Sequence, residues 1–197
     1  MDVGFNARLA GGLRVSGGTS TGRSRIKQCF VIDDPGTYIN PTTGFSTWTE
    51  QWCDRKPPFL TQFKGTVVYP LPWGGVQMSA IYLDVPGPDL STTSYVATNA
   101  EIAPSLGRNL AAGANATVTL PMMEPGSLYG DRLRRVDLRM GKSFTFGRTR
   151  VVPSVDIFNL LNASGVSAYN TRYGPQWLYA TEIQDPRVFR IAAQVDF

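Results

Sequence analysis

Histidine is absent from this chain of 197 residues, and charged residues make up only 17% of it. Without histidine the chain cannot form Ser-His-Asp or Cys-His catalytic groups, nor the histidine-based metal sites. Soluble domains usually have about a quarter charged residues, so the low charge argues against an ordinary cytosolic surface. No apolar run approaches the roughly 18 residues of a membrane helix, which excludes helical insertion. Nothing assembles a nucleophile, base and orienting group, so we expect no enzymatic activity.

Residues 187–197 carry the clearest pattern in the chain. Every second residue there is apolar: Phe189, Ile191, Ala193, Val195 and Phe197. This alternation indicates a strand whose two faces meet different surroundings. A soluble sheet with one face on a core would show it too. The length of about ten residues, the final aromatic residue and similar strands upstream favour a strand that crosses an outer membrane.

Further segments alternate in the same way, which predicts an all-β fold of about seven antiparallel strands. The expected strands lie at about 2–9, 13–18, 59–69, 76–82, 135–144, 150–158 and 187–197. Short glycine-rich turns follow the first, third and fifth strands, because glycine tolerates the positive φ of tight hairpins. Long irregular segments follow the others, with a short helix near 100–106. Pro153 is unusual in a strand because it cannot donate a ladder hydrogen bond.

Short turns that alternate with long loops are typical of bacterial outer-membrane barrels, with periplasmic turns and extracellular loops. We therefore expect an antiparallel transmembrane β-barrel segment. Single-chain bacterial barrels normally have an even strand number, and no export signal follows Met1. The odd number and the missing signal peptide predict that residues 1–197 form one unit, the C-terminal part of a larger barrel.

Two segments carry a family resemblance. Residues 135–150, RVDLRMGKSFTFGRTR, followed by residues 155–162, VDIFNLLN, resemble the C-terminal strands of TonB-dependent outer-membrane receptors. Residues 170–174 and 185–190 also resemble this family, particularly its large members with a carboxypeptidase-regulatory-like N-terminal domain. The chain's end is similar to the signal that the barrel-assembly machinery reads, carried here by Phe189, Ile191, Val195 and Phe197.

The resemblance implies a barrel of about 22 strands with a plug domain, which this chain lacks. It implies that the complete receptor uses TonB-coupled energy to take up a bulky, scarce solute, such as a siderophore, oligosaccharide or peptide. The implied location is the outer membrane of a Gram-negative-type bacterium. Implied partners are outer-membrane lipid, the remainder of the barrel and plug, the assembly machinery, and TonB only through the missing N-terminal part.

Candidate ligand contacts are basic residues of the polar phase and tryptophans of the loops. Arg135 and Arg139 would line the lumen, where a basic wall favours anionic solutes, although cross-strand salt bridges explain them equally. Trp48 and Trp177 could stack on a sugar or chelate ring, or simply pack the loops. The charged residues of the polar phase are Arg8, Arg14, Lys64, Arg135, Arg139, Arg150, Arg190, Asp137, Asp156 and Asp196.

Cys29 and Cys53 lie in one irregular segment, so we expect a disulfide formed in an oxidising compartment, with two free thiols as the alternative. No loop has the spacing of a calcium motif, and we expect neither metal nor cofactor. The net charge of +4 is scattered rather than clustered, so no nucleic-acid partner is expected.

The sequence also allows two other interpretations of the whole chain. In the first, the chain is a soluble all-β ligand-binding module whose apolar phase forms a core. Such a module would be soluble without detergent. In the second, the chain is a small stand-alone outer-membrane porin, which would need an eighth strand within a loop and an export signal upstream.

Overall fold

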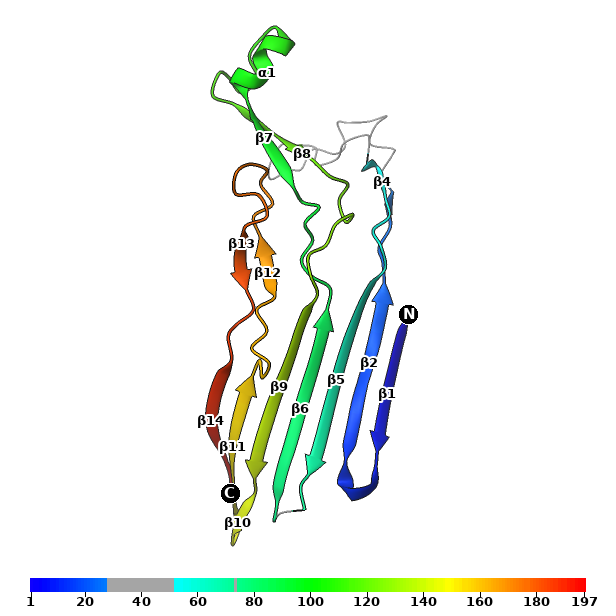
Figure 1. The fold of residues 1–197 in the computed structure, drawn as a ribbon, viewed down its shortest axis with the longest axis vertical. Coiled ribbons are helices and arrows are strands. Elements are labelled where there is room, and N and C mark those ends of the chain that lie inside the picture. Colours follow the sequence, from blue (N-terminus) through cyan, green and yellow to red (C-terminus); the bar gives the residue numbers. More distant parts are fainter. Residues whose placement is uncertain (28–51, 73) are drawn as a thin grey trace.

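A computed structural model describes residues 1–27, 52–72 and 74–197. The long strands are β1 (Asp2–Arg8), β2 (Arg14–Gly22), β5 (Leu60–Pro70), β6 (Val76–Val85), β9 (Leu133–Lys142), β11 (Thr149–Phe158) and β14 (Val188–Asp196). They form one antiparallel sheet, in which each long strand pairs with the next long strand along the chain (Figure 1). The short β10 (Phe144–Phe146) pairs with the start of β11. The predicted all-β fold and its seven strands are confirmed.

The long connections hold more structure than the sequence predicts. Three two-stranded ribbons lie in them: β3 (Ile26–Lys27) with β4 (Asp54–Arg55), β7 (Ser94–Thr98) with β8 (Thr117–Pro121), and β12 (Val166–Tyr169) with β13 (Ala180–Ile183). The prediction of irregular loops is wrong at these ribbons. Their strands have only two to five residues, which is too short for an alternating pattern to be recognised in the sequence. The described part of the chain has no helix that is long and apolar enough to cross a membrane.

The helix expected near 100–106 is confirmed as α1 (Asn99–Leu106), at the tip of the β7–β8 ribbon (Figure 1). Its start is fixed by a capping box, in which Thr98 and Glu101 bond each other's backbone groups. Gly107, at φ 68°, ends the helix in the left-handed conformation that glycine adopts without strain.

Turns and loops lie at opposite ends of the sheet (Figure 1). The turns β1–β2, β5–β6 and β10–β11 lie together at one end, and the ribbons and α1 lie at the other. The first turn contains the 3₁₀ helix η1 (Ala10–Gly12), where Gly11 and Gly12 have φ of 72° and 78°. This arrangement confirms the predicted alternation of short turns with long loops.

The strand register places the two residue phases on two separate faces, because directly opposed residues share a face. One row across the sheet is Ala7, Val15, Val67, Ala80, Leu138, Ile157 and Phe189. The next row is Arg8, Arg14, Val68, Ser79, Arg139, Asp156 and Arg190. We call the face that carries the first row the apolar face and the opposite one the polar face.

Burial in this sheet is the reverse of that in a soluble protein. Among the described residues, Leu90 and Ala97 are the only buried hydrophobic residues, and neither belongs to a long strand. On the apolar face Ile191 is 85% exposed, whereas Ser154 and Asp156 on the polar face are 2% and 3% exposed. Soluble domains bury their apolar side chains. This sheet leaves its apolar face uncovered.

The sheet is open at both sides. β1 and β14 are its outer strands, and within the described residues neither pairs with a further strand. The described residues form no closed barrel, and each outer strand presents a row of backbone groups without ladder partners among them.

Candidate functional site

Asp156 is the centre of an ion-pair group on the polar face. Its Oδ2 atom accepts a hydrogen bond from Arg190 Nε at 2.8 Å and lies 2.7 Å from Arg190 Nη2. Its Oδ1 atom lies 3.5 Å from Arg139 Nε. The Arg190 guanidinium also lies 5.0 Å from the centroid of the Phe158 ring. Because Arg139, Asp156 and Arg190 belong to β9, β11 and β14, the group joins the last three long strands.

A second group lies at the loop end of β9. Arg135 Nη2 is 3.1 Å from Asp137 Oδ2, and Asp137 Oδ1 accepts the backbone N–H of Asn159 at 2.9 Å. Arg135 and Arg139 thus lie on the polar face as predicted, and both have a carboxylate partner. The cross-strand ion pair that sequence reasoning left open is present at Arg139. Whether either arginine also contacts a ligand stays a prediction.

Asn159 and Asn162 fasten the start of the last strand, a role that sequence reasoning missed. Asn159 has φ 50° and its side chain is bonded to both backbone groups of Ala163 and to the Asp185 carbonyl. Asn162 Oδ1 accepts the backbone N–H of Arg187 at 3.0 Å. Asparagine directly after a strand is a local signal for such bonds, since it tolerates left-handed backbone and bonds nearby backbone groups.

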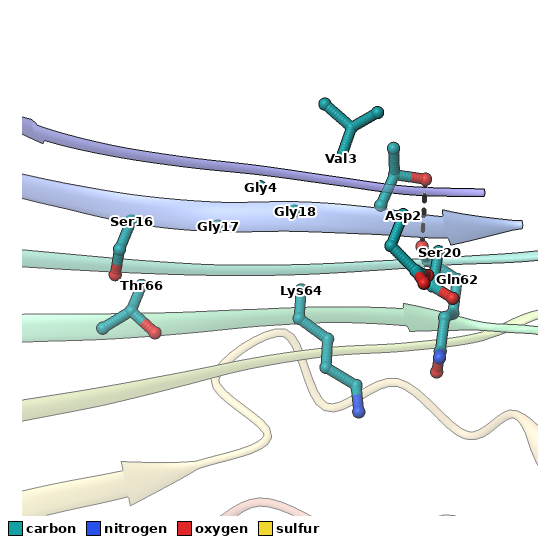
Figure 2. A pocket seen from close by; sticks show the side chains of 11 residues that line it. Asp2, Val3, Gly4, Ser16, Gly17, Gly18, Ser20, Gln62, Lys64 and Thr66 are labelled. Atoms are coloured by element: carbon teal, nitrogen blue, oxygen red, sulfur yellow. Dashed lines mark hydrogen bonds between the residues drawn. The ribbon is translucent and has the colours of Figure 1, made fainter.

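A glycine-rich hollow of about 380 Å³ lies on the polar face of β1, β2 and β5. It exists because Gly4 and Gly18 have no side chains, and a Cβ at Gly18 would lie 2.6 Å from the Val3 carbonyl oxygen. Figure 2 shows Lys64 and Gln62 extending from β5 beside it. The Lys64 ammonium gives this hollow a hydrogen-bond donor that can also attract an anion.

A smaller hollow of about 160 Å³ lies nearer the turns, between β6, β9 and β11. Two glycines, Gly75 and Gly141, leave it open, and Arg139 and Arg150 contribute the charge. Arg150 Nε donates to Ser143 Oγ at 2.9 Å. Since its lining has two guanidinium groups and no carboxylate, this hollow is suited to a small anionic group.

Trp177, between β12 and β13, contacts Thr93, which lies between β6 and β7. Its indole N–H donates to the hydroxyl of buried Thr93 at 3.1 Å, and its ring lies 5.6 Å from that of Tyr173. Tyr173 lies edge-on to Tyr95 at 6.4 Å and remains 51% exposed. Trp177 therefore packs the loops, and whether it also contacts a ligand stays a prediction. The exposed Tyr173 could stack on a ligand. Trp48 lies outside the described residues.

Two loop carboxylates, Asp54 and Glu101, have pKa values below their usual range because they accept hydrogen bonds. The pKa of Asp54 is lowered first by the Arg25 guanidinium, which donates two hydrogen bonds at 2.7 and 2.6 Å. The pKa of Glu101 is lowered first by the backbone N–H of Thr98 and then by the Tyr95 hydroxyl. Both carboxylates stabilise the local loop structure through these bonds.

Four residues of the expected assembly signal lie exposed on or beyond β14. Phe189, Ile191 and Val195 point to the apolar face, and Phe197 follows the end of the strand. Cys53 is disulfide-bonded, but Cys29 lies outside the described residues, so their pairing stays a prediction. Within the part of the chain that the structure describes, no three His, Cys, Asp or Glu residues gather in a group that could hold a metal ion.

The chain matches no protein-family model, no curated protein and no solved structure. Functional arguments therefore rest on the geometry and chemistry of its own residues.

Proposed function

We propose that the chain is the C-terminal part of the β-barrel of a TonB-dependent outer-membrane receptor. The exposed apolar face supports the membrane part of this proposal, and the resemblance of residues 135–150 and 155–162 supports the receptor family. Large apolar residues on all seven long strands share that face, and a fully exposed one would cost about 1.5–3 kcal/mol in water relative to burial. Lipid would remove that cost, while the polar face would turn to a water-filled lumen.

The two open edges support a larger barrel. Each unsatisfied backbone group in hydrocarbon costs several kcal/mol, so β1 and β14 both need partner strands in a membrane. The remainder of the receptor would supply those strands and close a barrel of about 22. The tight turns would lie in the periplasm and the ribbons with α1 outside the cell.

Solute uptake belongs to the complete receptor. Of the lumen residues, Arg139 and Arg150 flank a hollow suited to an anionic group of the solute. In the outer loops, Tyr173 offers an exposed ring beside Trp177. The solute would meet the loop aromatics first and the basic lumen wall afterwards. We assign the terminal residues Phe189, Ile191, Val195 and Phe197 to recognition by the assembly machinery.

A spin-label experiment tests which face meets lipid. Val67 and Thr66 are neighbours on β5 that point to opposite faces. Each is replaced by cysteine, Val67→Cys or Thr66→Cys, in a chain that also carries Cys29→Ser and Cys53→Ser. Each variant is labelled and reconstituted in phosphatidylcholine vesicles. Collision with oxygen should dominate at 67, because oxygen concentrates in lipid, and collision with a water-soluble nickel complex should dominate at 66.

The opposite result would support the soluble ligand-binding module. In that case the chain stays in solution without detergent, and the label at 67 is shielded from both reagents by a protein core. A chain that co-floats with the vesicles and shows the expected pair of accessibilities supports the membrane face.

A further inference from the structure

Three arginines stand at the loop end of the apolar face. Arg134 is directly opposite Asp84, which in turn is opposite Phe63 on the apolar face. Arg132 contacts the same Asp84 carboxylate, with Nε 2.7 Å from Oδ1. Arg23, just beyond the end of β2, places its guanidinium 4.6 Å from the centroid of the Phe59 ring. We call Arg23, Arg132 and Arg134 the arginine rim.

The rim has more positive charge than its acidic partner neutralises. Asp84 is the carboxylate that Arg132 and Arg134 share, and Arg134 Nε reaches it only at 3.4 Å. The side chain of Arg134 is 63% exposed. Arg23 forms no ion pair with any described carboxylate, since its contact is the Phe59 ring. Two of the three guanidinium groups therefore have donors free for a further anion.

The turn end of the same face differs. There the basic residue on the apolar face is Lys142, opposite Val76, with Nζ 5.1 Å from the Phe144 ring centroid. The loop end and the turn end of the apolar face thus each have a cation beside an aromatic ring, as expected where a membrane face meets headgroups. Among the described residues of this face, only the loop end has more than one arginine.

Resting on the proposed function, we propose that the arginines of the rim bind the phosphates of anionic lipids in the outer leaflet. A guanidinium forms a planar, two-pronged contact with phosphate oxygens and remains charged at any physiological pH. The rim lies where the apolar face ends, which is the depth of a lipid headgroup. Acyl chains of the same lipids would cover the apolar side chains beneath it, such as Phe63 and Tyr82.

The test measures lipid selectivity. The chain is reconstituted in vesicles with equal amounts of phosphatidic acid and phosphatidylcholine, recovered by flotation, extracted in mild detergent and examined by native mass spectrometry. Each arginine near a membrane surface is worth about fivefold in affinity for anionic lipid. The wild-type chain should retain phosphatidic acid over phosphatidylcholine by about 25-fold.

Variants locate the site. The double variant Arg23→Gln with Arg134→Gln should lose most of the preference, while Lys142→Gln, the matched cation over an aromatic ring at the other margin, should keep it. Arg132 is left unchanged because it also donates to the Thr61 carbonyl at 2.7 Å. If the double variant does not float with vesicles, the single Arg134→Gln should still lower the preference about fivefold.

The outcomes separate the two proposals. A wild-type chain that stays folded in solution without detergent and does not enter vesicles overturns the membrane assignment itself. A chain that floats but retains both lipids equally, or loses its preference equally in Lys142→Gln, overturns the arginine rim alone. Full displacement of the lipid by millimolar inorganic phosphate also overturns it, because the rim would then be a site for free anions.

Discussion

On the polar face Asp156 is 3% exposed, whereas Ile191, one strand away on the apolar face, is 85% exposed. The carboxylate is covered by the arginine side chains that bind it, and the isoleucine is covered by nothing in the described chain. The buried carboxylate is thus paired with protein cations, whereas the apolar side chain has no protein cover. That contrast is the physical basis for assigning the apolar face to lipid.

The largest effect should come from breaking the Asp156 group. Arg190→Ala would leave a buried carboxylate whose nearest cation, Arg139, is 3.5 Å away. Removal of one partner of a buried pair typically costs about 3 kcal/mol or more. Urea unfolding of the membrane-inserted chain would measure the free energy of unfolding. Arg150→Ala, which removes an arginine bonded to the Ser143 hydroxyl, is the control and should cost less than half as much.

Asn159→Ala should have the next largest effect. It removes three hydrogen bonds from a buried side chain and leaves their backbone partners without them. We expect a loss of about 2–3 kcal/mol and weaker amide-exchange protection at the start of β14. Asn162→Ala, which removes one bond to Arg187, should cost about 1 kcal/mol. Equal costs for the two variants would contradict the role given to Asn159.

The substitution Ile191→Arg tests whether the apolar face meets lipid or water. At a position 85% exposed, an arginine in water should change stability by no more than about 0.5 kcal/mol. On a lipid-facing wall it should cost about 2 kcal/mol. Unfolding in lipid vesicles gives the value, and Gln194→Arg on the polar face of the same strand is the control. Similar, near-zero costs for both would argue against lipid at Ile191.

We expect the smallest effect in helix α1 at the loop end, which should become less stable at acidic pH. The pKa of Glu101 is lowered by its hydrogen bonds, so it stabilises the fold above its usual value of 4.5, and this contribution is lost as pH falls through the lower, folded value. Amide exchange in α1 should therefore speed up at acidic pH. Glu101→Gln should already show the faster exchange at neutral pH, while the long strands exchange unchanged in both cases.

The sequence was informative where a single period governed a long segment. The alternation around Val67, Leu138 and Ile191 located the long strands within a few residues, and the short helix was expected near 100–106. The ribbons were missed because β7 and β8 are five residues each and pair across α1. The hydrogen bonds of the Asn159 side chain were not predicted, because only the fold brings Ala163 and Asp185 next to it.

By itself the sequence determined that strands would form, which residues share a phase, and that the chain would be all-β, because side chains alternate along any strand. The tertiary structure decided that the phases of all seven strands fall on the same two faces, since that depends on register. It also decided that Arg139, Asp156 and Arg190 meet, and that Arg132 and Arg134 share the Asp84 carboxylate. Residues so distant along the chain come together only through strand pairing.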